Sequence, residues 1–128
     1  MKEILMVAVA GAIGALSRWG ISRSLAQWLG SAFPYGTLVA NLLGCFLLGL
    51  IMQVGLSARI PSHWRLAVTI GFLGALTTFS TFSYETVAML QDANWLRGGL
   101  NIALNLICGL AATLAGIAAA RFLIGGGS

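Results

Sequence analysis

Uncharged stretches divide the chain into segments that are long enough to cross a lipid bilayer. A membrane-spanning helix needs about 20 mostly apolar residues. Such segments lie at Ile4–Ser22, Thr37–Leu56, Leu66–Tyr84 and Gly98–Ala120. Only the first contains a charged residue, Arg18, which lies near its far end. The pattern therefore predicts an all-α integral membrane protein with four transmembrane helices.

The first segment also has two features of a secretory signal peptide. Lys2 precedes an apolar run, Ile4–Leu16, and cleavage after it would leave three spans. The apolar stretch continues through Trp19 and Ile21 without a convincing small-residue cleavage site. This continuity favours a retained first helix.

The composition agrees with a membrane protein. Hydrophobic residues make up 59% and charged residues 8% of the chain, whereas soluble domains are about 25% charged. A small soluble domain has too little interior to bury so much apolar surface, although a helical subunit buried within a larger assembly is an alternative. Residues 1–124 are predicted to form one domain, and residues 125–128 a flexible tail of the kind added during cloning.

Small residues recur every four positions in the outer spans. In lipid this spacing lets helix backbones approach closely, although glycine is also generally tolerated in membrane helices. We therefore expect tightly packed helices. The repeats are Ala8/Ala12, Gly11/Ala15, Ala111/Ala115/Ala119 and Ala112/Gly116/Ala120.

Residues typical of enzymes and metal sites are sparse. The two cysteines, Cys45 and Cys108, lie inside spans and read as small apolar residues. The single histidine, His63, lies beside Trp64 in a loop and reads as interfacial. With no nucleophile–base pair and no metal-ligand spacing, the sequence predicts no enzyme.

Basic residues are distributed almost evenly between the two sides of the predicted membrane domain. A clear excess of Lys and Arg on one side sets the orientation of a membrane protein, and here the excess is small. A near-tie predicts insertion in both orientations and an antiparallel homodimer with a two-fold axis in the membrane plane. Scattered basic residues also argue against nucleic-acid binding. One side carries Lys2, Arg59, Arg65 and Arg121, and the other carries Arg23, Arg97 and, if it reaches outward, Arg18.

The third span carries a dense cluster of hydroxyl groups. Five of the seven residues from Thr77 to Ser83 are Ser or Thr, and the other two are Phe79 and Phe82. Such side chains face lipid poorly, although they can also bond back to their own helix. Glu85 follows the cluster; it either faces protein or water at membrane depth or marks the end of the span.

The same span has the features of a broken helix. Gly71, Gly74 and the pair Thr77-Thr78 favour a break near its middle, where freed carbonyls could hold a cation. Phe79 and Phe82 lie on one helix face. The edges of their rings are positive and suit a small anion, although such pairs often serve packing only.

Three motifs in this order resemble the fluoride channels called Fluc, also named CrcB, over nearly the whole chain. They are Gly14–Trp19, Pro34–Gly44 and Gly71–Ser83. The last, which includes Leu-Thr-Thr-Phe-Ser-Thr-Phe-Ser, is the most specific. The resemblance implies a passive, fluoride-selective channel that forms a dual-topology antiparallel homodimer with two pores. It also implies a multi-pass protein of the prokaryotic plasma (inner) membrane.

The resemblance assigns roles to individual residues. Phe79 and Phe82 match phenylalanines whose ring edges line the ion path, and Asn41 matches an asparagine whose amide N–H groups donate to fluoride. Gly74 and Thr77 match positions whose backbone carbonyls, from both subunits, hold a structural sodium ion. Arg18 matches a basic residue near the aqueous vestibule. Further polar positions along the route match Thr37, Ser80, Thr81, Ser83 and Glu85.

The chain departs from the family pattern in two places. Relatives often offer a serine from span four where this chain has Gly109. Asn105 and Thr113 lie one turn to either side on the same helix face and are the candidates to replace that serine in the pore. The glycine pair common in the third span is Gly74-Ala75 here.

Two other functions remain alternatives. A small multidrug-type proton-coupled exporter needs an embedded carboxylate in the first span, but that span has Arg18 and no acid beyond Glu3. A non-transporting assembly subunit would pass no ion when purified alone. A fluoride path fits better, because fluoride needs many hydrogen-bond donors of modest strength to replace its water.

Overall fold

A computed structural model describes residues 1–57 and 59–126, and over these residues the only regular elements are helices. Four of the helical stretches are long and apolar enough to cross a membrane, namely Lys2–Leu29, Tyr35–Leu56, Ser62–Gln91 and Trp95–Gly125. The predicted all-α fold with four spans is therefore confirmed. The elements are α1 (Lys2–Leu29), α2 (Tyr35–Leu56), α3 (Ser62–Leu66), η1 (Ala67–Leu73), α4 (Gly74–Leu76), α5 (Phe79–Gln91), α6 (Trp95–Ala103), η2 (Leu104–Cys108) and α7 (Gly109–Gly125).

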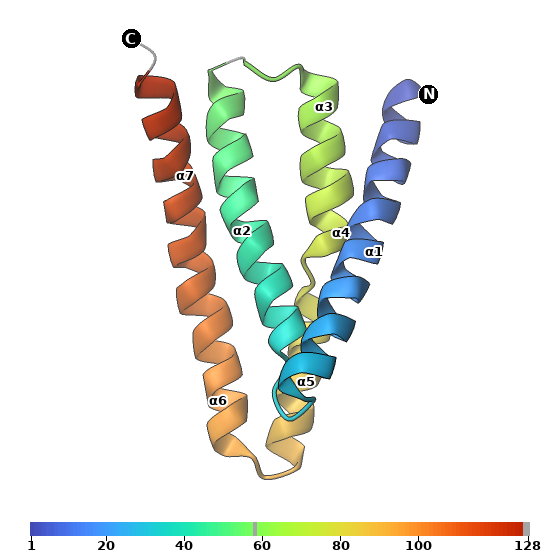
Figure 1. The fold of residues 1–128 in the computed structure, drawn as a ribbon, viewed down its shortest axis with the longest axis vertical. Helices are drawn as coiled ribbons and strands as arrows, with labels where there is room; N and C mark the ends of the chain where they lie inside the picture. Colours follow the sequence, from blue (N-terminus) through green and yellow to red (C-terminus); the bar gives the residue numbers. More distant parts are fainter. Residues whose placement is uncertain (58, 127–128) are drawn as a thin grey trace.

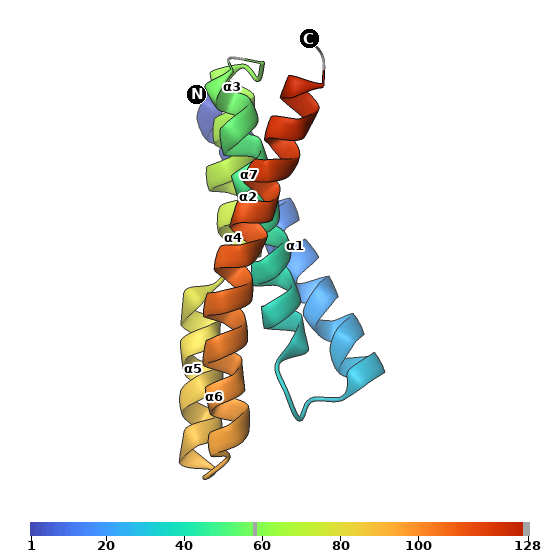
Figure 2. The ribbon, with the colours of Figure 1, turned by 90° about the vertical axis from the view of Figure 1, so that its left-hand side faces the viewer.

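The spans run alternately up and down, so both termini lie at one end of the molecule (Figure 1). At the other end, α5 and α6 extend well beyond the loop that joins α1 to α2 (Figure 2). The predicted tail, residues 125–128, begins inside a helix, because α7 continues to Gly125. Gly126 follows as a turn, and residues 127–128 lie outside the described residues.

The first helix is longer than the predicted span. It continues past Ser22 to Leu29 because no glycine or proline interrupts that stretch. Gly30 ends the helix with a positive φ of 82°, and its N–H donates to the carbonyl of Ala26. A positive φ at this position favours glycine.

Glycines set the closest helix contacts. A Cβ added at Gly116 on α7 would overlap the carbonyl oxygen of Phe46 on α2, and one added at Gly49 would overlap that of Thr113. Likewise, a Cβ at Gly14 on α1 would overlap the carbonyl of Phe72. The expected close packing is therefore present, and most helix surface beyond these seams is apolar and exposed, as suits a lipid solvent.

Only some of the predicted small-residue repeats lie in these seams. Gly116 and Ala120 are buried on α7, which packs against α2, whereas Ala111 and Ala115 are exposed. Ala8 and Ala12 are exposed on α1 as well, although Gly11 approaches Gly71. Spacing alone therefore does not identify which face of a helix packs.

The third span changes its backbone conformation four times. It begins as α3, widens into the π-helical segment η1, returns to α-helix in α4 and then becomes extended at Thr77 and Thr78 before α5 begins. Gly71 and Gly74 are helical rather than extended. Gly71 instead permits a close approach to α1, since an added Cβ would lie 2.8 Å from the carbonyl oxygen of Val7.

Candidate functional site

Asn41, on α2, bonds the extended segment of the third span in both directions. The backbone N–H of Thr78 donates to Oδ1 of Asn41 at 2.8 Å, and Nδ2 of Asn41 donates to the carbonyl of Thr78 at 3.3 Å. Broken helices are tolerated at membrane depth only where the freed backbone groups find partners. The Asn41 side-chain amide supplies one acceptor and one donor to these freed backbone groups.

Two backbone N–H groups at the break donate to side-chain oxygens. In a continuous helix they would donate to the backbone carbonyls of Gly74 and Thr77. In an α-helix the N–H of residue 78 would donate to carbonyl 74, and that of residue 81 to carbonyl 77. Here the Thr78 N–H donates to Asn41, and the Thr81 N–H donates to Oγ1 of Thr78 at 3.2 Å. The carbonyls of Gly74 and Thr77 therefore lack the N–H donors that a continuous helix would give them. These are the two carbonyls to which the family resemblance assigns a sodium ion.

A third carbonyl at this helix end accepts from Arg18. Its Nε donates to the Ala75 carbonyl at 3.1 Å, from α1 to α4. A cation at the C-terminal end of a helix is favourable because the carbonyl ends carry partial negative charge. Arg18 therefore caps α4 and lies one helical turn from Ser22, which lines a cavity described below.

A chain of side-chain amides continues from Asn41 to the last span and back to α5. Nδ2 of Asn41 donates to Oδ1 of Asn105 at 3.1 Å, and Nδ2 of Asn105 donates to the carbonyl and Oδ1 of Asn101 at 2.9 and 3.1 Å. Nδ2 of Asn101 donates to Oγ1 of Thr86 at 2.9 Å, and that hydroxyl donates to the carbonyl of Phe82 at 2.8 Å. The structure thus joins Asn41 on α2 directly to Asn105 on the last span.

Asn101 and Thr86 are site residues that the sequence analysis missed. They are 0% and 6% exposed, so two polar side chains are buried within the spans. A signal was present for Asn101, which lies one turn before Asn105 on the same helix face. Thr86 gave no such signal, because only the tertiary structure shows that it meets the fourth span.

The paired phenylalanines differ in exposure. The rings of Phe79 and Phe82 lie 5.6 Å apart between centroids and are tilted by 54°. Phe82 is 9% exposed, whereas Phe79 is 76% exposed. Only Phe82 is buried within the single chain.

A cavity of about 320 Å³ lies beside the break. It is large enough for a small ion with several waters. Its wall combines amides, hydroxyls and phenyl rings from three spans: Asn41, Thr77, Thr78, Phe79, Phe82 and Asn105 are among the lining residues, together with Gly74.

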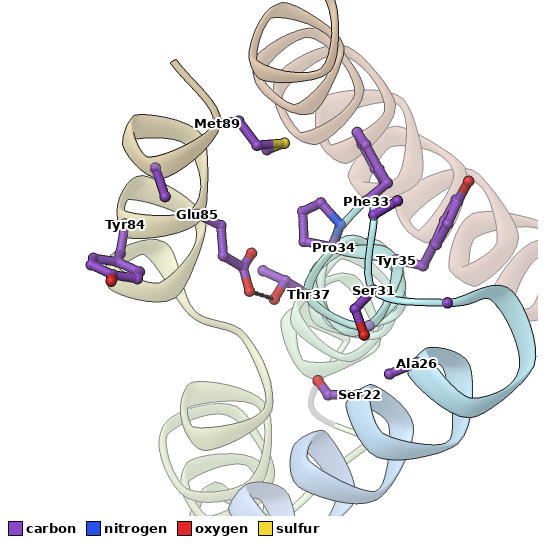
Figure 3. Close-up of a pocket in the computed structure, with 14 residues that line it drawn as sticks. Ser22, Ala26, Ser31, Phe33, Pro34, Tyr35, Thr37, Tyr84, Glu85 and Met89 are labelled. Carbon is purple, nitrogen blue, oxygen red and sulfur yellow. Dashed lines mark hydrogen bonds between the residues drawn. The ribbon is translucent and has the colours of Figure 1, made fainter. Parts of the chain in front are cut away.

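A second cavity, of about 360 Å³, opens where the loop between α1 and α2 faces α5 (Figure 3). Thr37 and Glu85 lie in its wall, and the Thr37 hydroxyl donates to Oε1 of Glu85 at 2.8 Å. The other carboxyl oxygen is buried and has no hydrogen-bond partner among the described residues. Glu85 thus lies in a cavity wall, and Tyr84 beside it is exposed.

The remaining predicted site residues make fewer contacts with the residues described above. Thr81 bonds the Thr78 hydroxyl at 3.0 Å, Ser80 lies 3.4 Å from it and is exposed, and Ser83 is half-buried. Thr113 lines neither of the two cavities described here, and its hydroxyl donates back to the carbonyl of Gly109 at 3.1 Å.

Side chains of the described residues offer no metal centre. Within 1–57 and 59–126, no three His, Cys, Asp or Glu residues cluster in a way that could hold a metal ion.

Comparisons with known proteins agree with one another. Residues 5–117 match the family model described as CrcB-like protein, Camphor Resistance (CrcB). A Fluoride-specific ion channel FluC from Dehalococcoides mccartyi is 50% identical over 111 residues, which cover 86% of this chain and 85% of that protein. The protein of the same name from Citrifermentans bemidjiense is 47% identical, and the alignment covers 96% of this chain and 100% of that protein. The one from Shewanella baltica is 49% identical, and the alignment covers 83% of this chain and 86% of that protein.

Proposed function

The chain belongs to the CrcB-like family, and on this basis we propose that it is a passive, fluoride-selective ion channel of the prokaryotic plasma (inner) membrane. The observation that carries the proposal is the cavity beside the break. There, amides, hydroxyls and phenyl rings converge inside a chain with four membrane-spanning helices.

The Asn41 amide is the first donor we assign to fluoride. Both of its N–H groups are engaged, one with the Thr78 carbonyl and one with Asn105. The bond to Thr78, at 3.3 Å, is the longer of the two. A fluoride ion would displace that carbonyl, so binding is offset by a lost hydrogen bond, and such modest net binding suits an ion that must also leave.

Phe79 and Phe82 supply the apolar part of the path. A ring edge carries partial positive charge, so it attracts an anion weakly without holding it as a full charge would. Hydroxyls of Ser80, Thr81 and Ser83 are the neighbouring donors on the same helix. Thr113 and Asn105 remain our candidates from the fourth span, with Asn105 favoured by its place in the cavity wall.

The second cavity serves as the aqueous entrance in this proposal. Thr37 and Glu85 lie in its wall, and Arg18 lies one turn from Ser22 at its edge. The positive charge of Arg18 raises the local concentration of anions, while its bond to Ala75 keeps the guanidinium out of the narrow path. Fluoride would then pass from this entrance toward Phe82.

We further propose that the channel is a dual-topology antiparallel homodimer with two pores. The near-equal distribution of basic residues supports insertion in both orientations. The exposed ring of Phe79 and the exposed Gly74 support it as well, because both lie at the break and would be covered by a second copy. A ring 76% exposed in one chain would then line a path between chains.

A structural sodium ion at the dimer centre is consistent with the backbone of the break. Gly74 and Thr77 have lost their helical donors to Asn41 and Thr78, so their carbonyls are oxygen ligands of the kind that replaces a cation's hydration shell. Two carbonyls per chain are too few for a cation, which is why the site needs both subunits. When bound, the ion would offset the partial negative charge of the helix ends.

The direct test is fluoride efflux from liposomes that contain the purified protein, read with a fluoride-selective electrode beside a chloride control. We expect rapid loss of fluoride and little loss of chloride, without a proton gradient. Protein that assembles in the membrane but passes no fluoride would refute the proposal and favour an assembly subunit. Proton-coupled cation flux would favour the exporter instead.

A further inference from the structure

We propose that Asn101 and Thr86 are positioning residues that hold the Asn41 amide in its working orientation. This inference rests on the proposed fluoride channel, since Asn41 is the donor there. It follows from the direction in which the amide chain donates, which is the same at every link.

The two ends of the chain determine this direction. At one end, the backbone N–H of Thr78 can only donate, and it donates to Oδ1 of Asn41. At the other end, the carbonyl of Phe82 can only accept, and it accepts from the hydroxyl of Thr86. Between them, each asparagine accepts from one neighbour and donates to the next.

An asparagine amide has nearly the same shape in either orientation, so packing alone does not choose between them. If Asn101 turned over, its Nδ2 would face Nδ2 of Asn105, and two donors would oppose each other. Relief would require Asn105 to turn as well, and then Asn41. Oδ1 of Asn41 would thereby leave the Thr78 N–H, and the break would lose its partner.

Thr86 prevents this rotation because its hydroxyl is already committed to the Phe82 carbonyl and therefore presents a lone pair to Asn101. The burial of both residues, at 0% for Asn101 and 6% for Thr86, leaves no water to substitute for either partner. The pair also joins α5 to α6, so Phe82 and the amide chain are held in one register.

The test compares Thr86→Val with Thr86→Ser in fluoride efflux from proteoliposomes. Valine keeps the volume but removes the hydroxyl, whereas serine keeps the hydroxyl. Ser57→Ala is the control: the Ser57 hydroxyl donates back to the carbonyl of Val54 at 3.0 Å, and Ser57 lines neither of the two cavities described above. We expect Thr86→Val to slow efflux about tenfold, as when a buried hydrogen bond is lost, and the other two variants to stay within about twofold of the wild type.

Hydrogen exchange of the side-chain amides, followed by NMR in detergent, gives a readout that does not depend on flux. The amide protons of Asn41 and Asn105 should be protected in the wild type and in Thr86→Ser and should exchange faster in Thr86→Val. If Thr86→Val does not assemble, Thr86→Cys replaces it, because a thiol is a weak donor and acceptor.

Wild-type flux in Thr86→Val, or equal slowing in Thr86→Ser, would overturn the inference. A wild-type protein that passes no fluoride would instead defeat the proposed function. In that case hydrogen exchange of the side-chain amides alone tests the positioning role. If the Asn41 and Asn105 amide protons are equally protected in the wild type and in Thr86→Val, the positioning role is overturned.

Discussion

The side-chain amide of Asn41 and the backbone of Thr78 bond each other reciprocally, with an N–H of each donating to an oxygen of the other. These residues lie 37 positions apart in the sequence and on different spans. The pairing holds the extended segment between α4 and α5, and Asn41 and Phe82 line the same cavity. The same contact thus accounts for the break and for the composition of the cavity wall.

Replacing Asn41 with Asp should nearly abolish fluoride efflux. The change removes both N–H donors and adds negative charge to an anion path, and like charges about 4 Å apart repel by several kcal/mol in a partly buried setting. Efflux from proteoliposomes measures the loss, and size-exclusion chromatography checks assembly. Normal conduction would remove Asn41 from the path.

Replacing Phe82 with Ile should suppress fluoride flux by about tenfold or more while the protein still assembles, because isoleucine fills much of the space but has no polar ring edge. Phe122→Ile is the control, since Phe122 lies on α7 away from the cavities and is 81% exposed. Equal flux in both variants would contradict a role for the ring.

Replacing Arg18 with Gln separates its two roles. Glutamine can still donate to the Ala75 carbonyl, but it has no charge to attract anions. We expect slower fluoride efflux at low ionic strength and a smaller difference from the wild type at high salt, because the Debye length falls from about 30 Å at 0.01 M to about 10 Å at 0.1 M. A deficit that does not depend on salt would argue for the helix cap alone.

Replacing Gly116 with Ala should destabilise the protein, because the added Cβ would overlap the Phe46 carbonyl oxygen. Overpacking of this kind costs about 1–3 kcal/mol. Gly99→Ala is the control, since nothing lies within 4 Å of its added Cβ, and alanine is the better helix former. Thermal unfolding in detergent should show a lower midpoint for Gly116→Ala only.

Labelling of one terminus tests the dual topology. With Cys45 and Cys108 replaced by alanine, a cysteine at Lys2 should react with an impermeant thiol reagent from both sides of the membrane. Both orientations are expected because the basic residues barely favour one side. Reaction from a single side would refute the antiparallel arrangement.

The exact position of the extended backbone in the third span was not predicted, because it depends on contacts between residues far apart in the sequence. The sequence analysis singled out the hydroxyl cluster and named Gly71, Gly74 and Thr77-Thr78 together as features that favour a break. The extended backbone lies only at Thr77 and Thr78, because Asn41 and the Thr78 side chain receive the amides there. Gly71 serves the approach of α1 instead.

The sequence by itself determined the four spans, the apolar surface and the types of polar residue available to an ion, because hydrophobic length and composition are local properties. Tertiary structure decided which polar groups meet. Asn41, Asn105, Asn101 and Thr86 come from three spans, and their bonds depend on how those helices rotate and slide against one another. Glycine contacts such as Gly116 with Phe46 set that geometry, and no repeat along the chain specifies it, because exposed and buried small residues recur with the same spacing.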